Sequence, residues 1–164
     1  CGVPDCECRR HSEIPLRAVI MTDRSKTDFI AVHCSATRPS QQVDVEDLRK
    51  WHKAKGWNDV GYHFVITRAG KVQKGRHEKA VGAHVEGFNG RSIGVCLVGG
   101  VSEDDFTKPE NNFTPAQMTA LLNLLVDLRK RYPGAVVQGH RDFPNVRKAC
   151  PSFDVRDWLK GVSA

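Results

Sequence analysis

Long hydrophobic runs are missing from this sequence of 164 residues. No stretch approaches the roughly 20 apolar residues that a membrane-spanning helix needs, so membrane insertion is not expected. The first ten residues also contain no apolar segment of the kind that forms the centre of a signal peptide. We therefore expect the chain to be made in the cytoplasm, unless a targeting segment is missing from this sequence.

A nucleic-acid-binding signature is missing as well. The chain is basic, with a net charge of +6, but no basic run is interleaved with aromatic residues, which make up only 7% of the sequence. Direct binding to nucleic acid is therefore not expected. Acidic and basic residues cancel over residues 1–20, so the positive excess lies in residues 21–164, where it could attract any anionic polymer.

Six cysteines are present, but a disulfide framework is not expected, because the chain is long enough to bury an ordinary hydrophobic core. Cys34 and Cys96 lie in apolar, strand-like runs, where small buried thiols are common. Cys150 instead lies in a polar loop beside Lys148, a setting that favours a lowered thiol pKa.

The other three cysteines cluster near the amino terminus. Together with His11 they form a C-x4-C-x-C-x2-H pattern that would suit a second metal site, although structural zinc sites more often use C-x2-C spacing. We expect a flexible tail instead. Residues 1–28 show no sustained periodicity, so we predict an amino-terminal extension there. Met21 could be a natural start, which would make residues 1–20 a leader or a segment foreign to the natural protein. One domain is predicted over residues 29–164.

The periodicity of that domain predicts an α/β fold with a central mixed sheet, one hairpin and flanking helices. Strands are expected over residues 29–34, 60–67, 71–73, 92–98 and 135–138, with the second and third forming the hairpin. A first helix should run from a cap at Asp44 to about Lys55, with Val45, Leu48 and Trp51 on its buried face. A short helix over 153–160 should end the fold.

The clearest helix is predicted over residues 115–131. Thr114 is its expected N-cap, Pro115 occupies the first helical position, and Gln117 completes a capping box. The residues expected on its core face are Met118, Leu121, Leu122, Leu125 and Leu128.

Two histidines and one cysteine form a candidate metal site. His33 ends an apolar run, and His140 and Cys150 bracket a polar loop near the other end of the chain. Two imidazoles and one thiolate leave the fourth tetrahedral position open for water, as in catalytic zinc sites rather than structural ones. Taken singly, a strand histidine usually only packs and a cysteine is usually inert, so the prediction depends on the three together.

Short motifs accompany these residues in a fixed order: VHCSAT at 32–37, WH at 51–52, GW at 56–57, VGYHF at 60–64, AVGAH at 80–84, Asn89, SIGVCLVGG at 92–100, NFTPAQ at 112–117 and KACPSFD at 148–154. With them, residues 29–161 resemble the amidase-type phage lysozymes. These are zinc N-acetylmuramoyl-L-alanine amidases related to the peptidoglycan recognition proteins. The resemblance covers about four-fifths of the chain.

The resemblance implies one catalytic Zn²⁺ held by the three candidate ligands, and hydrolysis of the amide between N-acetylmuramic acid and L-alanine of the peptidoglycan stem. It implies that Tyr62 and Lys148 are the catalytic side chains. Alternation along a strand would place Tyr62 and its neighbour His63 on opposite faces, so at most one of them should face the metal. The substrate-binding residues implied by the resemblance are Thr37, His84 and Asn89.

The chain departs from the phage lysozymes at two places. The loop from His140 to Cys150 is longer than theirs and closer to the recognition-protein pattern, and residues 1–28 have no counterpart. The resemblance further implies a monomer that stays in the host cytoplasm until lysis, acts on the cell wall, and in some relatives binds the phage RNA polymerase.

Two other functions are compatible with the residues. A non-catalytic peptidoglycan-binding module would share the fold, but modules of that type lack the zinc thiolate that Cys150 would supply. A thiol hydrolase could use Cys150 together with a histidine and would need no bound metal.

Overall fold

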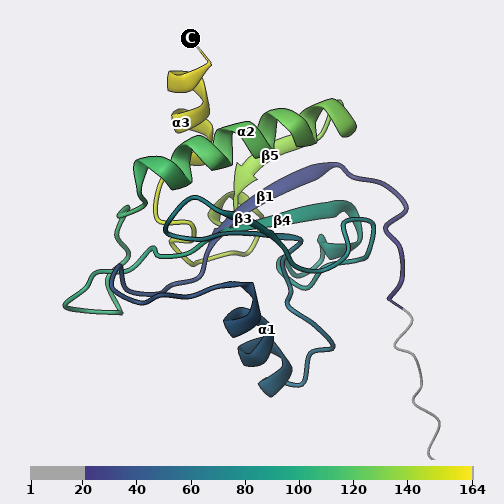
Figure 1. Ribbon diagram of the computed structural model, residues 1–164. Helices are drawn as coiled ribbons and strands as arrows, with labels where there is room; N and C mark the ends of the chain where they lie inside the picture. Colours follow the sequence, from purple (N-terminus) through teal and green to yellow (C-terminus); the bar gives the residue numbers. More distant parts are fainter. Residues whose placement is uncertain (1–20, 164) are drawn as a thin grey trace, which may run out of the picture.

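A computed structural model describes residues 21–163 of the chain; residues 1–20 and 164 lie outside the described part. Its centre is a sheet of five strands in the order β3-β2-β4-β1-β5 (Figure 1). The strands are β1 (Phe29–Cys34), β2 (Phe64–Ile66), β3 (Val72–Lys74), β4 (Ser92–Leu97) and β5 (Val136–Gly139). All neighbours are parallel except β2 and β3, which form the predicted hairpin, so the prediction of a mixed sheet is confirmed.

The two central strands, β1 and β4, are buried almost throughout, as expected for parallel strands covered on both faces. Ile93 and Val95 of β4 pack into one core cluster, together with Leu121 and Leu125. Cys96, which points the other way, packs into a second cluster. The sheet therefore separates two cores.

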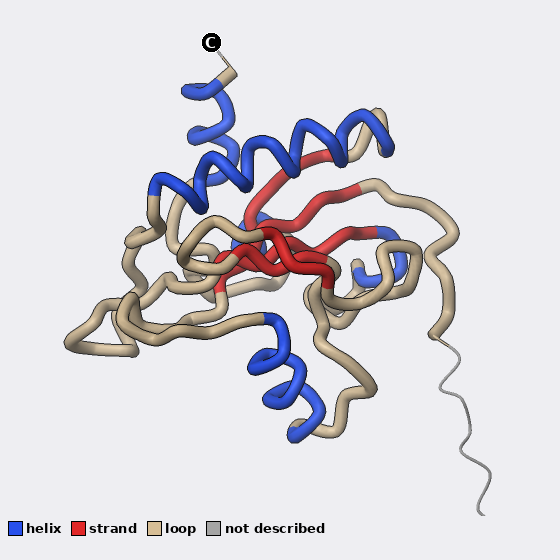
Figure 2. The backbone as a smooth tube through the Cα atoms, viewed as in Figure 1, coloured by secondary structure: helices blue, strands red, loops and turns tan. Residues whose placement is uncertain are grey.

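Three helices cover the two faces of the sheet. Helices α2 (Pro115–Arg131) and α3 (Val155–Val162) lie on one side, and α1 (Val45–Ala54) lies on the other (Figures 1 and 2). There are also two short 3-10 helices: η1 (Asn89–Arg91) directly precedes β4, and η2 (His140–Asp142) directly follows β5. The face that α1 only partly covers is the one that carries the candidate metal ligands.

The predicted ends of α1 and α2 are confirmed, whereas α3 begins and ends two residues later than the predicted 153–160. Asp44 accepts hydrogen bonds from the backbone N–H groups of Glu46 and Asp47 at the start of α1. At α2, Thr114 and Gln117 form the predicted capping box, and Pro115 is the first helical residue. These side chains bind backbone N–H groups that have no partner within the helix.

Two further details of the prediction are wrong. Trp51 of α1 is 44% exposed, whereas His52 is only 8% exposed and takes the inward position. Its Nδ1 accepts the Gly61 N–H at 2.9 Å, a contact that periodicity cannot reveal. The predicted strand over 60–67 is also shorter, because only Phe64–Ile66 join the sheet. The carbonyl of Gly61 pairs with Ala83 instead.

The segment from residue 21 to the first strand lies along the domain. Thr22 accepts the Val81 N–H through its carbonyl at 2.8 Å, and the Arg24 guanidinium donates to the carbonyls of Glu78 and Ala80. The rest of the predicted extension, with its three cysteines and His11, falls outside the described residues. Among residues 21–163, no helix is both long and apolar enough to cross a membrane.

Candidate metal centre and catalytic site

His33, His140 and Cys150 come together on the α1 side of the sheet. Their ligand atoms all lie within 4.8 Å of one another, although the residues come from β1, from η2 and from the loop before α3. Cys150 Sγ lies 3.9 Å from His33 Nδ1. A tetrahedral zinc with ordinary Zn–S and Zn–N bonds would separate those two atoms by about 3.5 Å, so the donor set fits such an ion with little adjustment.

The long loop between His140 and Cys150 is held closed by its own backbone. The Arg141 N–H donates to the Cys150 carbonyl at 2.9 Å, which joins the two ends of the loop. Phe143 is 3% exposed and packs against Ala31 of β1. The apolar anchor and the backbone bond therefore place the two distant ligands beside the strand that supplies the third.

Burial keeps both candidate histidine ligands neutral. It lowers the pKa of His33 well below its ordinary value, and it lowers the pKa of His140, with the positive charge of Lys148 acting in the same direction on both. A neutral imidazole has a free lone pair, so both rings are ready to bind a metal at neutral pH.

The cysteine behaves differently. A hydrogen bond with the Cys34 thiol, together with burial, raises the pKa of Cys150 well above its ordinary value. The Cys34 N–H also points at Cys150 Sγ, 3.3 Å away, and would support a thiolate there. A coordinated thiol is deprotonated outright, so metal binding at this site must release a proton.

The structure places Tyr62 beside the candidate ligands. Its ring centroid is 5.2 Å from that of His33 and 5.5 Å from that of His52. Burial raises the pKa of Tyr62 well above its ordinary range, so the phenol keeps its proton at neutral pH. His63 points elsewhere: its Nδ1 accepts the Gly94 N–H at 3.0 Å, and its Nε2 donates to the Ala80 carbonyl at 2.8 Å.

Lys148 is exposed on the loop, two residues before Cys150. Burial and, to a smaller extent, the positive charge of Lys148 lower the pKa of His33 and of His140. A catalytic role for this lysine stays a prediction.

The three predicted substrate-binding residues lie in different surroundings. Thr37 is 5% exposed, and its hydroxyl lies 2.7 Å from that of Ser35. Asn89 points inward, where its side-chain oxygen accepts the N–H groups of His84 and Val85 at 2.7 and 2.9 Å. His84 is only partly accessible and contacts His33. Binding of substrate by these three residues stays a prediction.

Sequence reasoning missed two neighbours of the site. The His52 ring is tilted against those of Trp57 and Tyr62, with centroids 4.6 and 5.5 Å away. Cys34 follows a ligand in β1 and meets Cys150 across 116 positions of sequence. The motif containing His52 was visible, but its inward orientation was not. The contact of Cys34 depends on how the loop folds back.

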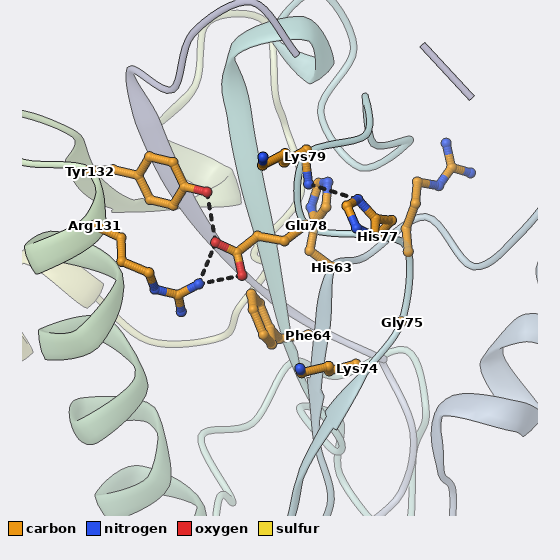
Figure 3. A pocket seen from close by; sticks show the side chains of 10 residues that line it. His63, Phe64, Lys74, Gly75, His77, Glu78, Lys79, Arg131 and Tyr132 are labelled. Carbon is orange, nitrogen blue, oxygen red and sulfur yellow. Dashed lines mark hydrogen bonds and ion pairs between the residues drawn. The ribbon is translucent and has the colours of Figure 1, made fainter. Parts of the chain in front are cut away.

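One cavity of the described residues is separate from the candidate metal centre. It has a volume of about 600 Å³ and lies between the hairpin and the end of α2 (Figure 3). Arg131 and the Tyr132 hydroxyl, from the end of α2, both point to the Glu78 carboxylate, which accepts the tyrosine O–H at 2.7 Å. None of the predicted site residues lines this cavity.

Known proteins are similar to this chain in both sequence and architecture. A family model described as N-acetylmuramoyl-L-alanine amidase matches residues 23–153. The endolysin of Escherichia phage T7 is 57% identical over 135 residues, which span 82% of this chain and 87% of that protein. Peptidoglycan-recognition protein SC2 of Drosophila melanogaster is 31% identical over 134 residues, or 77% of this chain and 67% of that protein.

A solved structure gives the same result. The endolysin N-acetylmuramoyl-L-alanine amidase LysCS from Clostridium intestinale superposes with a TM-score of 0.70 and 28% identity, covering 84% of each chain. The family match spans the strand, loop and helix segments that assemble the site. The chain therefore belongs to the N-acetylmuramoyl-L-alanine amidase family, and its relatives there include phage endolysins.

Proposed function

We propose that this chain uses one zinc ion, held by His33, His140 and Cys150, to hydrolyse the amide between N-acetylmuramic acid and L-alanine in peptidoglycan. Its membership of the amidase family gives the reaction and the substrate class. The observation that carries the zinc proposal is the convergence of two imidazoles and a thiol within 4.8 Å, with one tetrahedral position left over. Bound zinc would supply a Lewis acid for the scissile carbonyl and a means of ionising water near neutral pH.

The roles of the protein side chains follow from their protonation. Tyr62 keeps its proton at neutral pH, so it is suited to donate a hydrogen bond or a proton to the leaving amine. Lys148 is suited to stabilise the oxyanion that develops on the scissile carbonyl. A preorganised group of this kind contributes roughly 3 kcal/mol.

The test is a digestion of purified peptidoglycan with and without a chelator that removes zinc. New amino groups of L-alanine, without new reducing sugars, are expected, and chelation should abolish them. Elemental analysis of the purified chain should give one zinc per molecule. A metal-free protein that still cleaves the amide would instead support the thiol hydrolase, which needs no ion.

Binding of a phage RNA polymerase, the monomeric state and a cytoplasmic stage before lysis stay predictions. A pull-down with the cognate polymerase and sedimentation of the purified chain test the first two.

A further inference from the structure

A second histidine lies against the candidate ligand of β1. His84 Nδ1 is 3.0 Å from His33 Nε2, and the two rings meet edge to face, with centroids 5.0 Å apart and planes at 88°. The other nitrogen of His33, Nδ1, is the one that faces Cys150. The ring of His33 therefore has one nitrogen on the metal side and one on the His84 side.

A hydrogen bond between two imidazoles needs one N–H and one bare nitrogen, which determines the tautomers. When His33 offers the Nδ1 lone pair to a metal, its Nε2 carries the proton and donates to His84 Nδ1. His84 then carries its proton on Nε2, 3.4 Å from Ser92 Oγ, and that hydroxyl donates to the Phe88 carbonyl at 2.8 Å. In this series of hydrogen bonds, every donor faces an acceptor.

The fold keeps a slot open for the His84 ring. A Cβ atom at Gly94, in the middle of β4, would lie 2.7 Å from Cγ of His84. A Cβ atom at Gly82 would lie 2.5 Å from Cδ2 of the same ring. Glycine inside a strand usually weakens it and marks a close approach of another group. At Gly94 the approaching group is this imidazole alone, whereas at Gly82 the His63 ring also lies close, with its Cε1 2.9 Å from such a Cβ.

The backbone of His84 is fixed as well as its ring. Asn89 accepts the N–H of His84 at 2.7 Å, so the residue is held at both ends. A side chain that served only to fill space would need neither the amide anchor nor the polar chain through Ser92.

We propose that His84 is a positioning residue, which fixes the tautomer and ring orientation of His33 for zinc binding; this rests on the proposed zinc site. Partners of this kind, one bond beyond the metal ligands, typically change metal affinity by about 10- to 100-fold when they are removed.

The test compares His84→Leu with His84→Asn. The two side chains have the same branched shape, but only Asn places a hydrogen-bond acceptor where His84 Nδ1 lies. Zinc affinity is measured by chelator competition on the purified full chain, without substrate. We expect Leu to weaken zinc binding by about 10- to 100-fold and Asn to restore most of it. Spectra of chain labelled with ¹⁵N-histidine should show the proton of His33 on Nε2 in the wild type and in the Asn variant.

A second pair of variants leaves His84 itself unchanged. Gly94→Ala should displace the ring and weaken zinc binding in the same direction, whereas Gly90→Ala should not, because a Cβ there meets nothing within 4 Å. This pair keeps the proposal testable if the His84 variants fold poorly.

Three results would overturn the inference. Equal zinc affinity in the wild type and His84→Leu, with weaker sedimentation on cell walls, would make His84 a substrate contact only. An equal loss in the Leu and Asn variants that follows their melting temperatures would make the role merely structural. A wild-type chain that takes up no zinc would overturn the proposed zinc site, and this inference with it.

Discussion

At the scale of single residues, ligand and catalyst can be separated within one loop. Cys150→Ser should lose zinc and activity, because a neutral hydroxyl is a far weaker ligand than a thiolate. Lys148→Ala should keep stoichiometric zinc and yet lose amidase activity by about 100-fold or more. Metal content and amide cleavage, measured on the same preparations, check both. A fully active Lys148→Ala would mean that the lysine is only a surface charge.

Tyr62→Phe provides a separate prediction. The ring stays beside His33, but the hydroxyl that keeps its proton is removed. We expect zinc and cell-wall binding close to wild type, with turnover reduced by about 100-fold, since proton transfer contributes on that scale. Turnover is measured with saturating peptidoglycan, so that a change in binding does not obscure the result. A rise in KM at unchanged turnover would instead make Tyr62 a substrate contact.

The three ligands could be predicted from sequence because each stands in a recognisable local context and in the family's order. The bond between His33 and His84 could not be predicted in this way. The two residues are 51 positions apart, and their contact requires the loop after Ala80 to enter a slot left by two glycines. Spacing along the chain contains no information about such a bond.

At the scale of elements, α2 was predicted to the residue, because its cap, its proline and its stop signal are all local. The buried face of α1 was not predicted correctly. Leu48 is followed by Trp51 at i+3 and by His52 at i+4, and both spacings are compatible with one helical face. The choice depends on the Gly61 N–H, which belongs to another segment of the chain.

Gln117 joins α2 to the sheet, and its replacement should weaken this connection. Its side chain is fully buried, and its Nε2 donates to the carbonyls of Val98 and Ile66 at 2.8 and 3.2 Å. Gln117→Leu removes the donor and should lower the free energy of unfolding by about 2 kcal/mol, without changing zinc affinity. Urea titration measures the difference. Asn123→Ala, on the exposed face of the same helix, is the control and should stay within about 0.5 kcal/mol.

At the scale of the whole molecule, buried neutral histidines should make the fold sensitive to acid. Burial lowers the pKa of His63 to about 4, below its value of about 6.5 in an unfolded chain. The unfolded state therefore binds the proton first, and stability falls as the pH drops from 6.5 toward 4. For His63, which is 1% exposed, the loss is about 3 kcal/mol.

Urea titrations of the wild type and of His63→Asn, with chelator present throughout, measure this loss. The variant cannot take up that proton, so its free energy of unfolding should fall less between pH 6.5 and pH 4. The other buried histidines titrate in both proteins and cancel in the comparison. Parallel curves for the two proteins would show that His63 does not contribute to the acid sensitivity.

The amino-terminal boundary of the folded unit is also a property of the whole molecule. A chain that starts at Met21 keeps the contacts of Thr22 and of Arg24, whose guanidinium reaches across to the segment around Glu78. It also keeps all of residues 23–153, which match the family. We therefore expect a melting temperature and a rate of cell-wall clearing like those of the full chain.

A chain that starts at Phe29 loses these bonds and leaves the carbonyls of Glu78 and Ala80 without that guanidinium, so it should melt several degrees lower. If the two shortened chains were equally stable, residues 21–28 would not contribute to the fold; if both were destabilised, the folded unit would extend into residues 1–20.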